Sequence, residues 1–149
     1  MSRTIKITLI CLTFFCLFTH PLFAASSVKT MVKVIHASTG SNHVDSNLSS
    51  IISELKSVFK YTSYRLLSNQ QLTQPFNRQG SVNLPGNRTL LITPTEMNGK
   101  RIKYKIVILK GSKSIFQTQV LLKNNNSITI GGPQYDNGVL LFDIMGSAN

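Results

Sequence analysis

Apolar and polar residues alternate over most of this chain, which is the pattern of β-strands that bury one face. Residues 101–110 show it most clearly, with apolar residues at every second position and basic residues between them. Turn-forming pairs such as Pro85-Gly86 and Asn98-Gly99 separate the runs. The pattern predicts about eight strands, over residues 32–35, 64–72, 82–84, 88–93, 101–110, 114–122, 127–130 and 139–144.

One segment has a helical period instead. Between residues 46 and 60 the apolar residues recur three or four positions apart, which places them on one face of a helix. They are Leu48, Ile51, Ile52, Leu55, Val58 and Phe59. Asp45 or Ser46 is suited to cap its N-terminus. We therefore expect an α+β, mainly β fold, with one amphipathic helix over about 46–60 packed on an antiparallel sheet or a small sandwich of about seven to eight strands.

The first 24 residues have the three parts of a secretory signal peptide. Arg3 and Lys6 precede an apolar run over residues 7–18, and small residues surround Ala24. The run is too short to span a bilayer, which needs roughly 20 apolar residues. We expect residues 1–24 to be removed and residues 25–149 to form a single β-rich domain in the periplasm or outside the cell.

Cysteine usage agrees with a bacterial host. Cys11 and Cys16 are the only cysteines, and both lie in the predicted signal. Residues 25–149 therefore hold no disulfide, thiolate metal site or cysteine nucleophile. An exported domain of this size without disulfides is typical of a bacterial envelope rather than of a eukaryotic secreted module.

The charge balance favours anionic partners. Removal of the two signal residues leaves 16 − 2 = 14 Lys and Arg against 5 Asp and Glu. A basic cluster spans residues 100–113, and its alternation places Arg101, Lys103 and Lys105 on one strand face. The residues predicted to bind anions are Arg101, Lys103, Lys105, Lys110 and Lys113, with Lys100 beside them. Anionic lipid headgroups or envelope polysaccharide fit better than nucleic acid, because no aromatic residues that stack with bases lie between the lysines. A solvated face that discourages sheet association is the simpler alternative.

Catalytic and metal-binding groups are few. Ser41, His43 and Asp45 are the residue types of a serine triad, but they share one short loop with Ser46 and cannot adopt triad geometry. His36, His43 and Asp45 do not have the spacing of a known metal motif. We predict no catalytic residue, metal site or cofactor.

Two further features have structural interpretations. Asp143 alternates with Phe142 and Ile144, which predicts that it faces solvent. Gly131-Gly132 lacks the Lys-Ser/Thr of a phosphate loop, so we interpret it as a bulge or strand exit.

Short segments resemble known bacterial proteins. The strand Gln117-Thr118-Gln119-Val120, the turn over 124–126 and the strand ending at Gly131-Gly132 resemble a segment of secretins. The helix, the Tyr64-Arg65-Leu66-Leu67 strand, Leu84-Pro85-Gly86 and the Gly-Gly-Pro hairpin resemble small exported bacterial β-rich proteins without an assigned role. Neither resemblance implies a specific activity, and a chain this short does not build a secretin pore wall alone.

Two functions remain open at this point. The first is a non-enzymatic envelope or secreted protein that binds a protein partner or an anionic envelope surface. The alternative is a hydrolase acting on cell-wall or carbohydrate substrates, with Asp136, Asp143 or Glu96 as its acids.

Overall fold

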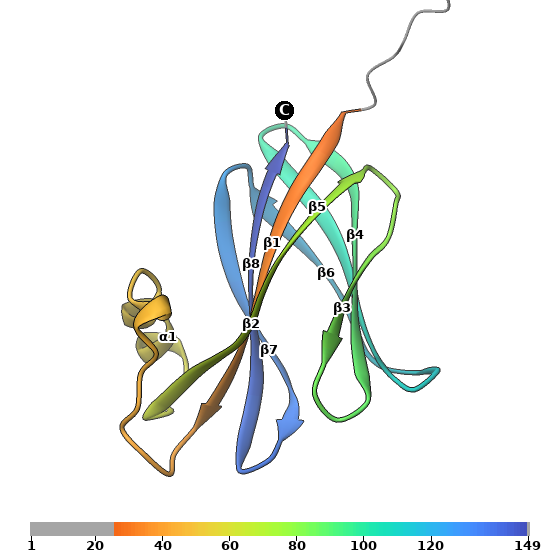
Figure 1. The fold of residues 1–149 in the computed structure, drawn as a ribbon. Coiled ribbons are helices and arrows are strands. Elements are labelled where there is room, and N and C mark those ends of the chain that lie inside the picture. The colour runs from red at the N-terminus through yellow and green to blue at the C-terminus, as the bar shows by residue number, and fades with distance from the viewer. Residues whose placement is uncertain (1–25, 149) are drawn as a thin grey trace, which may run out of the picture.

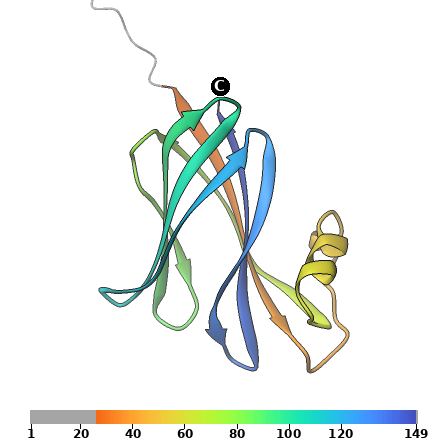
Figure 2. The same ribbon diagram turned by 180° about the vertical axis from the view of Figure 1, so that it is seen from behind.

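The computed structural model describes residues 26–148, which form two antiparallel four-stranded sheets with one short helix (Figures 1 and 2). The first sheet has the order β2-β1-β8-β7, and the second sheet has the order β3-β4-β5-β6. The mainly β fold with one helix on a sandwich is confirmed. The strands are β1 (Ser27–Ser38), β2 (Ser63–Pro75), β3 (Gly80–Leu84), β4 (Arg88–Asn98), β5 (Arg101–Lys110), β6 (Lys113–Lys123), β7 (Asn126–Tyr135) and β8 (Gly138–Ala148).

The main core lies between the two sheets. Strand β5 contributes the apolar residues that the alternation of 101–110 predicted to face inward, and all four are fully buried: Ile102, Tyr104, Ile106 and Ile108. The first sheet faces them with Val32 on β1 and Phe142 on β8, which belong to the same cluster. Burial of one face of each sheet thus fixes which side chains point outward.

A buried hydrogen bond joins the two sheets inside this core. The hydroxyl groups of Thr30 on β1 and Tyr104 on β5 lie 3.0 Å apart. Gly146 on β8 leaves room for the Tyr104 ring, because a Cβ at that position would collide with the phenol oxygen. Burial raises the pKa of Tyr104, with the Thr30 hydroxyl acting in the opposite direction, so the phenol stays protonated and able to donate.

The helical segment is shorter than the predicted helix over 46–60. A 3₁₀ turn, η1 (Ser46–Leu48), is followed after a break by α1 (Ile52–Val58). Asp45 caps η1, as the sequence indicated. Helix α1 covers one end of the face of the first sheet that points away from the second (Figures 1 and 2). Val58, at the margin of the predicted stripe, does not reach the sheet and is 64% exposed.

Tyr64 attaches this helical segment to the sheet. Its ring is buried in the smaller cluster with Leu48, Leu55 and Ile35. Its hydroxyl donates to the Phe59 carbonyl at 2.7 Å, just after α1 ends. A seven-residue helix has little stability of its own, so these contacts hold it in place.

One predicted turn and one predicted bulge are also confirmed. Asn98-Gly99 lies at the β4–β5 hairpin, and Gly99 has a φ of 59° that suits glycine. Gly131-Gly132 lies at a bulge, where the β7–β8 register shifts between Gly131 and Gln134.

The buried hydroxyl pair gives a stability prediction. Tyr104→Phe should lower the free energy of unfolding by about 1–3 kcal/mol, because it leaves the Thr30 hydroxyl without its partner. Adding Thr30→Val should recover part of this loss, since both polar groups are then gone. Urea denaturation measures all three proteins, with Tyr135→Phe as a control at a less buried tyrosine. A Tyr104→Phe protein as stable as the wild type contradicts the prediction.

Candidate functional site

The basic residues predicted to bind anions do not form one patch. Arg101, Lys103 and Lys105 point outward from the second sheet, because the residues between them fill the core. Lys110 and Lys113 face each other across the β5–β6 turn. That turn is at the other end of β5 from Arg101, about 30 Å away at the usual rise of a strand. The cluster is therefore divided between the two ends of the second sheet.

Lys103 is already paired with an acid. It lies opposite Glu96 in the β4–β5 register, and its Nζ is 3.1 Å from the Glu96 carboxylate. Lys105 lies between Thr93 and Gln119 on the neighbouring strands. The charge of the predicted stripe is thus partly neutralised at its centre.

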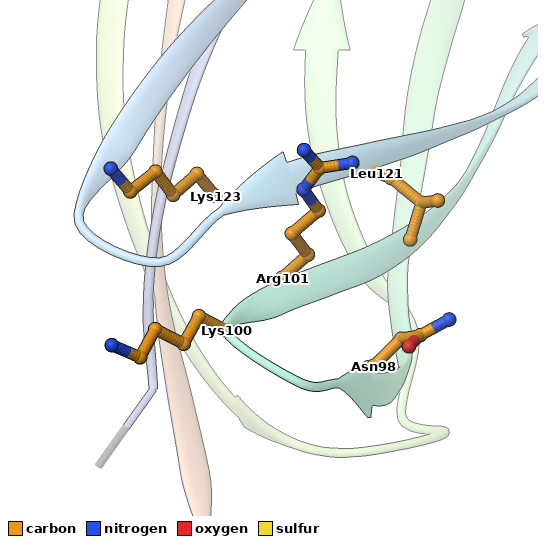
Figure 3. Close-up of a pocket in the computed structure, with 5 residues that line it drawn as sticks. All are labelled: Asn98, Lys100, Arg101, Leu121 and Lys123. Carbon is orange, nitrogen blue, oxygen red and sulfur yellow. The ribbon is translucent and has the colours of Figure 1, made fainter.

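Three cations instead gather at one end of the second sheet. Lys100 lies in the β4–β5 turn, Arg101 begins β5, and Lys123 ends β6. Together with Asn98 and Leu121 they line a hollow of about 440 Å³, which we call the basic hollow. Figure 3 shows the three cationic side chains around the ends of β5 and β6. Gly99 and Lys100 form the two-residue turn between Asn98 and Arg101, which places Lys100 at this end of the sheet.

The basic hollow holds positive charge without a matching acid. Arg101 lies directly opposite Lys123 in the β5–β6 register, and like charges in that position repel. Within residues 26–148 the ion pairs are Lys33–Asp143 and Lys103–Glu96, and neither involves the hollow. A bound anion would relieve this repulsion.

Lys123 is the member of the hollow that sequence reasoning missed. Counting back from the Lys110–Lys113 pair places Arg101 opposite Leu122. A bulge between Ile108 and Leu109 shifts the register by one residue and brings Lys123 there instead. Only knowledge of the bulge would have identified the pair.

A second hollow lies near the β7–β8 turn. It has a volume of about 270 Å³ and is lined mainly by polar residues: His36, Ser38, Gly40, Ser41, Ser63, Arg65, Asp136 and Asn137. His36 and Arg65 are register partners on β1 and β2. The His36 ring meets Tyr135 edge to face at 5.4 Å, and its Nε2 is buried without a hydrogen-bond partner. Such a lining can hydrogen-bond water or a small polar molecule.

The structure does not bring together His36, His43 and Asp45, the residues considered as metal ligands. Asp45 accepts a hydrogen bond from the Asn47 backbone N–H at 3.0 Å, which lowers the pKa of its carboxyl group. His43 lies in the preceding loop, whereas His36 lines the second hollow. Residues 26–148 contain no group of three or more His, Cys, Asp or Glu side chains placed to hold a metal ion.

The prediction that Asp143 faces solvent is wrong. Asp143 is only 4% exposed, although its side chain points away from the main core, as the alternation of residues along β8 predicts. Strand β8 is central in its sheet, so side chains from both neighbouring strands cover Asp143. Lys33 Nζ lies 3.9 Å from Oδ2, and the Thr129 hydroxyl donates to Oδ1 at 3.4 Å. Burial raises the pKa of Asp143, and Lys33 opposes this shift.

The acids considered for a hydrolase lie on separate elements. Glu96 is on the second sheet beside Lys103, and Asp136 is in the β7–β8 turn. Asp143 is on β8, five residues past the start of that strand, which is about 17 Å of extended chain.

No family model, curated protein or solved structure matches this chain. The resemblance of residues 117–132 to secretins therefore stays a prediction. In the described part of the chain, no helix has the length and apolar character needed to cross a membrane.

The buried carboxyl group at Asp143 gives a prediction about pH. Its folded-state pKa is raised, so the folded protein binds the proton more tightly than the unfolded chain. The resulting stabilisation is fully present below the unfolded value near 3.8 and is lost as pH rises through the folded pKa. The free energy of unfolding of the wild type minus that of Asp143→Asn should therefore be larger at pH about 4 than at pH about 7.

Urea denaturation of both proteins at the two pH values measures this difference. Glu54→Gln, at an exposed helix position, controls for the loss of one acid. A difference that grows with rising pH would mean that attraction to Lys33 outweighs burial.

Proposed function

We propose that this protein is exported and acts as a non-enzymatic binding protein of the cell envelope or its exterior. The basic hollow would recognise anionic groups on an envelope surface. The observation that carries this proposal is the gathering of Lys100, Arg101 and Lys123 around one hollow with no acid in its lining. Like charges held close together destabilise the folded protein relative to uncharged polar residues at the same positions. Their presence there supports a role in binding.

The chemistry of the lining favours phosphate groups. The Arg101 guanidinium group can form two parallel hydrogen bonds to phosphate oxygens, and the two lysines add point charges. Leu121 is exposed beside them and offers an apolar contact. A membrane surface that carries phosphate headgroups or lipopolysaccharide provides both kinds of contact. The positive balance of residues 25–149 also draws such a surface towards the protein.

The basic hollow can be tested with charge-matched variants. Arg101→Gln/Lys123→Gln should weaken binding to vesicles of phosphatidylglycerol and phosphatidylcholine in equal parts by roughly 30-fold, at ~1 kcal/mol for each basic residue near the surface. Lys110→Gln/Lys113→Gln removes the same charge at the other end of the sheet and should have a much smaller effect. Cosedimentation at low and moderate salt measures both.

Glu96→Gln provides a second control. It frees Lys103 from its ion pair, so binding should strengthen if the face next to the basic hollow meets the surface. Equal weakening by the two double variants would mean that diffuse charge, and not the hollow, binds the vesicles. No binding by the wild type at low salt would refute the anionic surface as the ligand.

Export predicts a processed product. A bacterium that expresses the full chain should release protein from its periplasm or medium with Ala25 as the first residue. Leu9→Arg/Leu12→Arg interrupts the apolar run and should leave the full-length chain inside the cell. Mass spectrometry of fractionated cells distinguishes the two products. Full-length wild-type protein confined to the cytoplasm would contradict this part of the proposal.

A further inference from the structure

The two sheets have four edge strands, and β6 is the least protected of them. Strand β3 has only five residues, and β7 is interrupted by its bulge and by Pro133. The outer edge of β2 is partly occupied, since backbone bonds join Tyr64 to His43 and to Asp45. Short length, bulges, proline and covering loops are the usual means of preventing edge pairing.

Strand β6 lacks most of these protections. It runs for eleven residues, Lys113–Lys123, without proline or glycine. In the described part of the chain its backbone pairs with β5 alone. Ile115, Phe116 and Leu121 are exposed at 41%, 36% and 47%. A long edge with apolar side chains and unpaired backbone groups is a template for another strand.

The residue order of β6 is nearly symmetric about Thr118. An antiparallel copy centred on Thr118 would place most residues opposite one of similar character, Ser114 opposite Leu122 being the exception. The regular cross-strand pairs are Thr118 with Thr118, Gln117 with Gln119, and Phe116 with Val120, and Ile115, at the bulge, would lie near Leu121. Apolar and polar pairs of this kind stabilise neighbouring strands. A second copy of this chain necessarily carries the matching residue order, whereas a strand from an unrelated protein in general does not.

We propose that β6 pairs with β6 of a second copy of this chain, across a two-fold axis at Thr118. The second sheets of the two copies would then form one continuous eight-stranded sheet, twice the four strands of each. Residues 116–120 follow the regular β5–β6 register beyond the bulge, so their outer edge is straight enough to pair. This proposal rests on the edge of β6 and does not require anion binding, although Leu121 and Lys123 also line the basic hollow.

Two variants at the same exposed positions test both the pairing and its register. Gln117→Lys/Gln119→Lys places lysine opposite lysine in both cross-strand pairs and should weaken the dimer. Gln117→Lys/Gln119→Glu places lysine opposite glutamate in both pairs and should strengthen it. From the usual strength of such pairs, each shift in the dimerisation constant should be roughly twofold to thirtyfold. Sedimentation equilibrium over a range of concentrations measures it.

The outcomes distinguish a second copy of this chain from another protein as the partner of β6. Opposite shifts for the two variants support pairing centred on Thr118. Equal shifts would overturn that register, and a wild type that stays monomeric at millimolar concentration would overturn self-pairing. A monomeric protein that binds a synthetic peptide of unrelated β-strand sequence would instead point to a strand from another protein.

The salt dependence of dimerisation distinguishes this proposal from anion binding. The symmetric pairing brings Lys113 close to Lys123 of the second copy at both ends of the paired strands, although the bulge at Ile115 keeps the two from lying directly opposite. Raised salt screens that repulsion and should strengthen the dimer, whereas it should weaken vesicle binding. Lys113→Gln removes one lysine from each opposed pair and should strengthen the dimer while reducing its response to salt. A dimer that weakens with salt in both proteins contradicts the register.

Discussion

Burial of the inner face of β5 is the constraint on which the rest of this structure depends. Ile102, Tyr104, Ile106 and Ile108 meet the first sheet, and the Tyr104 hydroxyl reaches across to Thr30. The Tyr104 ring fits only because Gly146 has no side chain. With that face committed to the core, the intervening basic residues point outward. The position of the candidate site is therefore a consequence of core packing.

The same arrangement explains why the candidate site lies at the end of the sheet. In the middle of the outer face, Lys103 has Glu96 as a neighbour. At the end, the turn and the bulge bring together Lys100, Arg101 and Lys123, and no acid joins them. Local repulsion is tolerable there because water screens it and the core carries the stability. A surface used for binding can keep such a cluster at small cost to folding.

Local patterns predicted most of the fold. The alternation in β5, the Asn98-Gly99 turn and the bulge at Gly131-Gly132 depend on residues close together in sequence. Local patterns do not reveal features that depend on segments far apart in sequence. The exposure of Val58 depends on how far the first sheet extends beneath α1, and the burial of Asp143 depends on β1 and β7 lying on either side of β8. Lys123 joins the site through a one-residue bulge that no local pattern indicates.

The two central strands of the first sheet come from opposite ends of the described chain. Val28 on β1 is paired with Ala148 on β8, so almost every other residue lies between these partners in sequence. The centre of this sheet cannot assemble until β8 has been synthesised, because β1 has no other partner on that side. The nascent chain therefore remains without its complete core throughout translation. Passage through a narrow translocation channel in the unfolded state, which the proposed export would require, would benefit from this order of assembly.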